Sequence, residues 1–203
     1  DSTDYYCVIE DIDSEQVMLK IESFRRCSAE LKTKLYLFQA LPKQDKMEFI
    51  VQKAVELGAH EIIPVASSRC VVKLDDKKRQ EKKLARWQMI AESAAKQSAR
   101  GIIPKVGGIM SFKEAIDYAA NLSYSIIPYE HAKGMEESRQ YINEAAECDS
   151  VGIFIGPEGG FEEEEIEYAV KSGIKPISLG NRILRTETAG LCVLSILMFK
   201  LSE

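Results

Sequence analysis

The sequence of 203 residues lacks the features that assign a chain to several common protein classes. It has five cysteines, an odd number, and no two of them are spaced as CxxC, so neither a disulfide framework nor a zinc site is indicated. No apolar run approaches the about 20 residues that span a bilayer, and no basic and apolar leader is recognisable. We therefore expect a protein of the reducing cytoplasm.

Three familiar ligand-binding motifs are also missing. No GxxxxGK[ST] segment is present, which excludes a P-loop nucleoside triphosphatase. No GxGxxG follows the first strand of an α/β pattern, which excludes the common dinucleotide loop and the ordinary Rossmann-type methyltransferase loop, and no GxSxG forms a nucleophile elbow. The two histidines, His60 and His131, lie on different predicted elements, so a metal site has little support.

Strand and helix patterns alternate regularly from residue 34 onward. Apolar and β-branched runs predict six strands, at 35–40, 62–66, 102–106, 122–127, 151–155 and 175–179. Helical periodicity predicts a helix after each strand, at 43–58, 78–99, 111–120, 134–146, 161–171 and 186–201, with Gly58 and Gly173 as stops and a capping box at Ser111. Six such units predict an α/β fold, a mostly parallel sheet with helices on both faces.

The N-terminal segment has a different pattern. Residues 5–23 predict two short strands around the polar turn 11–15. A lone hairpin is marginal in water. We therefore expect residues 1–30 to be the last strands of a small β domain, whose earlier strands lie upstream of Asp1, and residues 31–203 to be the main domain. The alternative is a hairpin docked on that main domain.

Charge is unevenly distributed along the sequence. The net charge is −5, yet residues 69–105 hold eleven Lys or Arg against four Asp or Glu, whereas residues 158–167 hold six acids and no base. The basic stretch suits a phosphate backbone and suits a solvated helix face equally well.

Two strand ends in the second half of the chain break into irregular loops that enter helices, IGPEGGF at 155–161 and LGNRILRTETA at 179–189. In an open α/β sheet, ligands bind where strand carboxyl ends meet helix N-termini, because unpaired backbone N–H groups point there. Two such loops predict one shared site. The second loop also mixes Arg182, Arg185 and Glu187 with apolar and hydroxyl side chains, a mixture that a plain turn does not need.

These two loops, together with QALPKQDKMEFIVQKAVELG at 39–58 and RWQMIAESAAKQSAR at 86–100, resemble the RsmE family of SPOUT-class enzymes, which methylate N3 of a uridine in bacterial 16S rRNA. The resemblance covers the chain from about Leu35 to its end. It implies a C-terminal trefoil knot, a homodimer and S-adenosylmethionine (SAM) bound among three loops. It also implies that residues 1–30 are the remnant of an N-terminal PUA-like RNA-binding β-barrel.

The resemblance assigns the SAM site residue by residue. The glycines of the second loop allow close backbone approach to a flat ligand or a positive φ, although each could serve a tight turn alone. Three aliphatic side chains of the third loop could enclose the adenine, with core packing as the alternative for Leu179, and Thr186 is expected to N-cap the last helix. The predicted SAM-binding residues are Ile127, Pro128, Tyr129, Gly156, Pro157, Glu158, Gly159, Gly160, Leu179, Gly180, Ile183, Leu184, Thr186, Thr188 and Ala189.

The expected chemistry concerns the proton on uridine N3, which must leave for N3 to attack in line with the S–CH₃ bond. A cation beside the uracil oxygens favours the anion, and Arg185, with Arg182 second, is suitably placed in the loop. Glu187 is a candidate proton acceptor or an orienting partner of Arg185. The alternative is an Arg185–Glu187 pair that only shapes the loop. No metal is required, because SAM brings the reactive group.

The expected partner is 16S rRNA or the small ribosomal subunit. Predicted RNA contacts are Arg69, Lys73, Lys96, Arg100 and Arg182, and each of the first four could equally be a solvated charge. Two other functions stay open: a SPOUT enzyme that acts on another rRNA or tRNA position, and a non-catalytic α/β module that binds RNA or a nucleotide. The intact LGNRILRTETA loop argues against the module.

Overall fold

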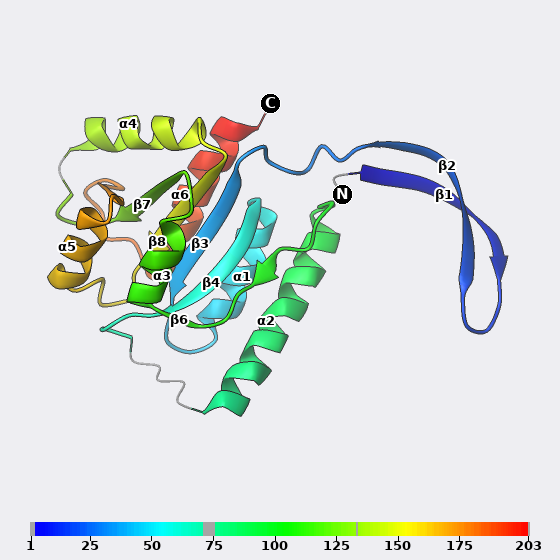
Figure 1. The fold of residues 1–203 in the computed structure, drawn as a ribbon, viewed down its shortest axis with the longest axis horizontal. Helices are drawn as coiled ribbons and strands as arrows, with labels where there is room; N and C mark the ends of the chain where they lie inside the picture. Colours follow the sequence, from blue (N-terminus) through cyan, green and yellow to red (C-terminus); the bar gives the residue numbers. More distant parts are fainter. Residues whose placement is uncertain (1–2, 71–75, 133, 203) are drawn as a thin grey trace.

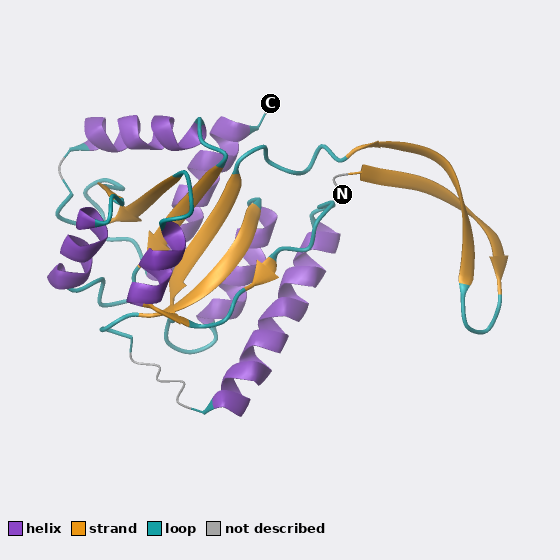
Figure 2. Cartoon of the chain, in the orientation of Figure 1, coloured by secondary structure: helices purple, strands orange, loops and turns teal. Residues whose placement is uncertain are grey.

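The computed structural model describes residues 3–70, 76–132 and 134–202, arranged as an α/β domain with an N-terminal hairpin (Figures 1 and 2). None of the helices in these ranges is long and apolar enough to cross a membrane. The elements are β1 (Thr3–Ile12), β2 (Val17–Arg26), β3 (Lys34–Ala40), α1 (Lys46–Glu56), β4 (Ala59–Ala66), α2 (Lys77–Gln97), β5 (Lys105–Val106), β6 (Met110–Ser111), α3 (Phe112–Ala119), β7 (Tyr124–Pro128), α4 (Met135–Ala146), β8 (Ser150–Ile155), α5 (Glu163–Lys171), β9 (Lys175–Ile177) and α6 (Thr186–Leu201).

The main sheet has seven strands, all paired in parallel, in the order β5-β4-β3-β8-β7-β9, with β6 also beside β4. The α/β class and the parallel sheet are therefore confirmed. The central strands β3 and β8 are apolar and buried on both sides, as parallel strands between helical layers must be. The carboxyl end of β8, which carries the glycine-rich loop, consequently lies in the middle of one edge of the sheet.

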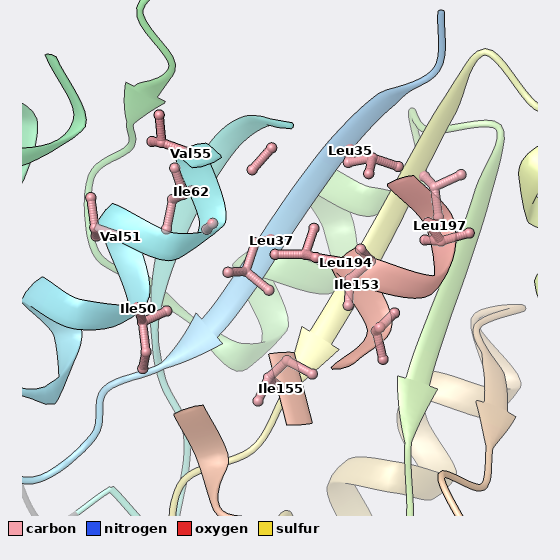
Figure 3. Close-up of a cluster of buried hydrophobic side chains, with 14 of the residues drawn as sticks. Leu35, Leu37, Ile50, Val51, Val55, Ile62, Ile153, Ile155, Leu194 and Leu197 are labelled. Atoms are coloured by element: carbon pink, nitrogen blue, oxygen red, sulfur yellow. The ribbon is translucent and has the colours of Figure 1, made fainter. Parts of the chain in front are cut away.

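Helices cover both faces of the sheet. One core cluster joins the sheet to α1, α2, α4 and α6, and a second joins it to α3 and α5. Figure 3 shows Leu37 of β3 and Ile153 of β8 pointing toward Leu194 of α6 within the first cluster. In the second cluster, the rings of Phe38 and Phe154 stack with their centroids 4.3 Å apart. The helix α6 therefore packs beneath the strands that flank the predicted site.

Most predicted boundaries agree with the structure. The capping box at Ser111 is present, and Gly58 and Gly173 take φ of +87° and +91° just after their helices, as predicted. The strand predicted at 102–106 is wrong in extent: only Lys105–Val106 pairs with β4, and Met110–Ser111 pairs separately. Pro104 precedes this pairing and cannot donate to a ladder, and Gly107 and Gly108 interrupt it.

The N-terminal hairpin has two strands of ten residues, longer than predicted, joined by a turn in which the Asp13 carboxylate accepts N–H bonds from Glu15 and Gln16. The hairpin extends away from the α/β domain (Figure 1). Its apolar side chains are exposed, among them Ile9 at 62% and Phe24 at 72%.

Candidate functional site

The three predicted loops meet at the carboxyl ends of β7, β8 and β9. The Tyr129 N–H donates to the Ile177 carbonyl over 2.9 Å, which joins the first loop to the end of β9, from which the third loop leaves. The Thr186 hydroxyl donates to the Gly156 carbonyl over 2.6 Å, which joins the third loop to the second. The structure therefore brings the predicted cofactor loops together at one place.

Thr186 does not cap the last helix as predicted. The N-cap is Arg185, whose side chain makes no capping bond, and Thr186 is the first helical residue, 4% exposed. Its hydroxyl donates to Gly156 and accepts from Gln39 Nε2 over 2.9 Å. The half-buried Gly156 carbonyl, directly after β8, needs a donor, and the Thr186 hydroxyl provides it. Thr186 therefore connects β3, β8 and α6.

Gln39 is a site residue that was not predicted. Its side chain is fully buried at the end of β3, and its amide also donates to the Ala40 carbonyl. Its Oε1 atom has no hydrogen-bond partner among the described residues and lies 3.5 Å from where a Cβ on Gly190 would stand. The sequence motif that contains Gln39 was recognised, but only the tertiary contact with Thr186 assigns this residue to the site.

The glycine-rich loop is a tight turn braced from its own ends. The Gly160 N–H donates to the Pro157 carbonyl over 2.9 Å, and Gly160 has a φ of +69°. A Cβ on Gly156 would lie 3.3 Å from the Gly160 backbone and 3.2 Å from the Phe161 ring. Both glycines therefore meet requirements of the turn itself, whatever ligand the turn binds.

Arg69 and Glu165 connect this loop to the segment after β4. Arg69 donates to the Gly159 carbonyl over 2.8 Å and pairs with Glu162 at 2.6 Å. This contact, with hydrogen bonding the largest cause, lowers the pKa of Glu162. The Glu165 carboxylate, 9% exposed, accepts from the Ser68 N–H and hydroxyl and from the Glu162 N–H. Arg69 therefore supports the glycine-rich loop, although 42% of its side chain stays exposed.

Lys46, at the start of α1, joins the second and third loops electrostatically. Its Nζ lies 3.2 Å from Glu158 Oε1 and 3.3 Å from Glu187 Oε2, the second contact without hydrogen-bond geometry. The hydrogen bond to Glu158 is the main cause that raises the pKa of Lys46. Burial raises the pKa of Glu158, but hydrogen bonds, including those from the Lys43 N–H and from Lys46, outweigh it and leave that pKa lowered. Lys46 was also missed by sequence reasoning.

The two arginines of the third loop are exposed. Within the part of the chain that the structure describes, neither Arg182 nor Arg185 forms an ion pair or a side-chain hydrogen bond, and Glu187 contacts Lys46 instead of Arg185. The alternative of an Arg185–Glu187 pair is therefore not what the structure shows. The guanidinium of Arg185 remains available for a ligand.

The side chains predicted to enclose the adenine are unevenly placed. Ile183 is 89% exposed and encloses nothing as the loop stands. Leu184 is half-buried, and Leu179 is half-buried against the first core cluster, which agrees with its core-packing alternative. Ala189 also packs against that cluster, while Thr188 is exposed.

The remaining predicted RNA contacts differ in their surroundings. Arg100 has 3% of its side chain exposed, pairs with Glu30 at 2.6 Å and donates to two backbone carbonyls, so its prediction as an RNA contact is wrong. Its partner Glu30 lies 70 residues earlier, so the residues around Arg100 in the sequence give no sign of the pair. Lys96 is exposed and pairs with Glu92 on the same helix. Lys73 lies outside the described residues.

Neither of two hollows in the described surface is lined by residues of these loops. One, of about 230 Å³, lies between the start of α1 and α2, and the other, of about 350 Å³, is lined by residues that include Lys32, Cys148 and Lys200. Residues 3–70, 76–132 and 134–202 contain no group of three or more side chains that could hold a metal ion.

Comparison with known proteins assigns the family. The sequence profile of the RNA methyltransferase domain family matches residues 29–198. The chain is 36% identical over 197 residues to the Ribosomal RNA small subunit methyltransferase E of Bacillus subtilis, covering 96% of this chain and 77% of the relative. The chain belongs to the ribosomal RNA small subunit methyltransferase E family. The methyltransferase E of Mesomycoplasma hyopneumoniae is 40% identical over 166 residues, which cover 82% of this chain and 70% of that relative.

Solved structures of family members have the same fold. The putative methyltransferase Lpg2936 of Legionella pneumophila, in complex with SAM, has a TM-score of 0.82 and 33% identity, covering 97% of this chain and 78% of its own. The methyltransferase E of Neisseria gonorrhoeae, bound to S-adenosyl methionine, has a TM-score of 0.80 and 32% identity, covering 96% and 77%. The resemblance inferred from the four sequence motifs is confirmed.

Proposed function

We propose that this protein methylates N3 of a uridine in the 16S rRNA of the small ribosomal subunit, with SAM as methyl donor. The observation that carries the proposal is the convergence of three loops, linked by Thr186 and Lys46, in a chain whose fold matches SAM-bound family members. The relatives' names support the class of RNA, and the uridine N3 position rests on the family resemblance. A cytoplasmic location accords with a ribosomal substrate.

The residues at the loops fit a cofactor with a flat base and a charged tail. Nothing lies within 4 Å of a Cβ built on Gly160 or Gly180, so backbone borders open space there. Tyr129 and Leu184, on the first and third loops, are half-buried and can offer apolar contact. We propose that the cofactor is held by the three loops at the predicted positions, with Ile183 closing over the base. SAM, when bound, supplies an electrophilic methyl group.

The side chains of the third loop suit the proton chemistry of uridine. Arg185 has an unpaired guanidinium that stabilises negative charge on the uracil oxygens as N3 loses its proton. Arg182 stands second to it. We propose Glu187 as the acceptor of that proton. Lys46 contacts and orients Glu187, so Lys46 is the partner of Glu187 in place of Arg185. Arg182, Arg185 and Glu187 all lie on the third loop or in the first turn of α6.

Three further parts of the proposal concern architecture. The helix α6 lies between α1 and α4 and beneath β3 and β8, although the strand before it stands at the sheet edge, and this return supports a trefoil knot. Exposed apolar groups on α1 and α6 support a homodimer: Phe49, Ile196 and Phe199. The exposed apolar residues of the hairpin support residues 1–30 as part of a PUA-like β domain separate from residues 31–203.

Calorimetric titration with SAM, with ATP and NAD as controls, tests this function first. Selective SAM binding followed by mass spectrometry of treated small-subunit rRNA is expected to locate one N3-methyluridine. A methyl group on another base, or on tRNA, would replace the substrate and keep the class. A folded protein that binds no SAM would refute the methyltransferase and leave the non-catalytic module.

A further inference from the structure

The first half of α2 has an excess of positive charge that does not stabilise the helix. Residues 77–86 hold six Lys or Arg and one Glu, and the first turn contains no acid. Cations at a helix N-terminus oppose the helix dipole, and like charges three or four residues apart repel. This charge therefore lowers the stability of the helix, which indicates a role outside it.

Four of these six cations line one hollow between the start of α1 and α2. The hollow has a volume of about 230 Å³. The buried side chains of Met47 and Trp87 form its apolar part, and Lys83 Nζ lies 6.0 Å from the Trp87 ring centroid. The residues that line it are Gln44, Asp45, Met47, Glu48, Arg79, Lys82, Lys83, Arg86 and Trp87.

Most of the positive charge in the hollow is not neutralised. Arg86 pairs with Glu48 at 2.6 Å. Within the described ranges, Arg79, Lys82 and Lys83 form no ion pair, and Asp45 is the one other acid in the lining. Four cations against two carboxylates leave a concave surface that attracts an anion, and the spacing of the cations puts them on one face of α2.

We propose that this hollow binds a phosphate of the RNA backbone, near the nucleotide that enters the three-loop site. The proposal rests on the proposed function, because it takes the anion to be the same RNA substrate. Gln44 and Asp45 line the hollow, and the next residue, Lys46, contacts Glu158 and Glu187 of the site. A single strand that places one nucleotide at the loops thus has its neighbouring backbone beside a basic hollow.

The test measures RNA affinity by fluorescence anisotropy over a salt series. The probes are a single-stranded fragment of small-subunit rRNA and an RNA of equal length and unrelated sequence. Lys82→Gln with Lys83→Gln neutralises the hollow and spares the Arg86 ion pair. Lys113→Gln with Lys200→Gln is the matched control, because both lysines are exposed and lie outside this hollow.

The hollow variant is expected to bind both RNAs about tenfold more weakly at about 0.15 M salt, with the slope of log affinity against log salt shallower by about 1.4 for two lost phosphate contacts. Its SAM affinity is expected to stay unchanged and its urea midpoint to hold or rise, because repulsion within α2 is reduced. The control pair is expected to change RNA affinity and slope little.

Equal RNA affinities for the two variants would overturn the proposal, and so would a folded parent protein that binds no RNA. A hollow variant that loses affinity for polyglutamate but keeps its affinity for RNA would also overturn it, because that result would indicate an acidic protein partner. Failure of the proposed function can be distinguished from failure of the phosphate site. A parent that binds no SAM while its hollow variant still loses RNA affinity refutes the methyltransferase and keeps the phosphate site.

Discussion

Thr186→Val is the substitution that tests how the site is held together. Valine keeps the shape of threonine and removes the hydroxyl that donates to the Gly156 carbonyl and accepts from Gln39 Nε2. One buried N–H of Gln39 then has no acceptor, because only its bond to the Ala40 carbonyl remains. We expect a loss of about 2–4 kcal/mol in the free energy of unfolding, combining one stranded donor and one lost carbonyl bond.

Urea unfolding measures this loss, with Thr188→Val as the control for the stability effect. Thr188 is exposed two residues later in the same helix, so its replacement is expected to change stability by less than about 0.5 kcal/mol. SAM affinity of the Thr186 variant is also expected to fall, because the Gly156 carbonyl is no longer tied to α6.

A double-mutant cycle sharpens the test. Gln39→Leu combined with Thr186→Val replaces both partners by apolar groups, so no side-chain N–H at position 39 is left buried without an acceptor. We expect the double variant to be more stable than the sum of the single losses predicts, by about 1–2 kcal/mol. Equal stabilities of Thr186→Val and Thr188→Val, or strict additivity in the cycle, would refute the reasoning.

Three other predictions follow from the site and its surroundings. Arg185→Ala is expected to lower turnover by about a hundredfold and to leave SAM affinity nearly unchanged, and equal losses in both would contradict its role. Lys46→Met is expected to weaken SAM binding several-fold against the control Lys43→Met, whose backbone N–H alone contacts Glu158. Burial, with a contribution from Lys34, lowers the pKa of His60 below its value in the unfolded chain. The unfolded chain then binds the extra proton, so stability falls as pH drops from about 7 to about 5, by at most about 1.4 kcal/mol per unit, and His60→Gln is expected to flatten that fall in urea midpoints.

The alternation of elements could be predicted because each signal is local. A buried parallel strand needs a run of apolar residues, and each helix carries its own apolar stripe and stop, such as Gly58 or Gly173. The predicted extent of the strand at 102–106 was wrong, because its pairing with β4 depends on where Pro104 and two glycines permit backbone hydrogen bonds. The three loops could be assigned because their motifs are continuous in sequence.

The connections between the loops could not be predicted in the same way. Gln39 and Thr186 are 147 residues apart, and Arg69 and Glu162 are 93 apart. Nothing in the residues next to Arg100 shows that it is buried against Glu30. Nothing next to Lys46 shows that it contacts Glu158 and Glu187, so neither set of contacts could be predicted. Pairing partners of charged side chains are properties of the fold, whereas strand and helix signals are properties of segments.

The contacts of Lys46 are consistent with the different roles proposed for Arg185 and Glu187, which stand near each other in sequence. A carboxylate with no other partner would pair with the nearby guanidinium and neutralise the charge that the uracil oxygens need. Lys46 contacts Glu187 instead, while also binding Glu158, and Arg185 stays unpaired among the described residues. If this division of charge matters, Lys46→Met allows Glu187 to approach Arg185, so turnover should fall further than the loss of SAM affinity explains. Adding Glu187→Gln to Lys46→Met removes the carboxylate that would neutralise Arg185: turnover that stays low then fits Glu187 as proton acceptor, and a full recovery of turnover contradicts it.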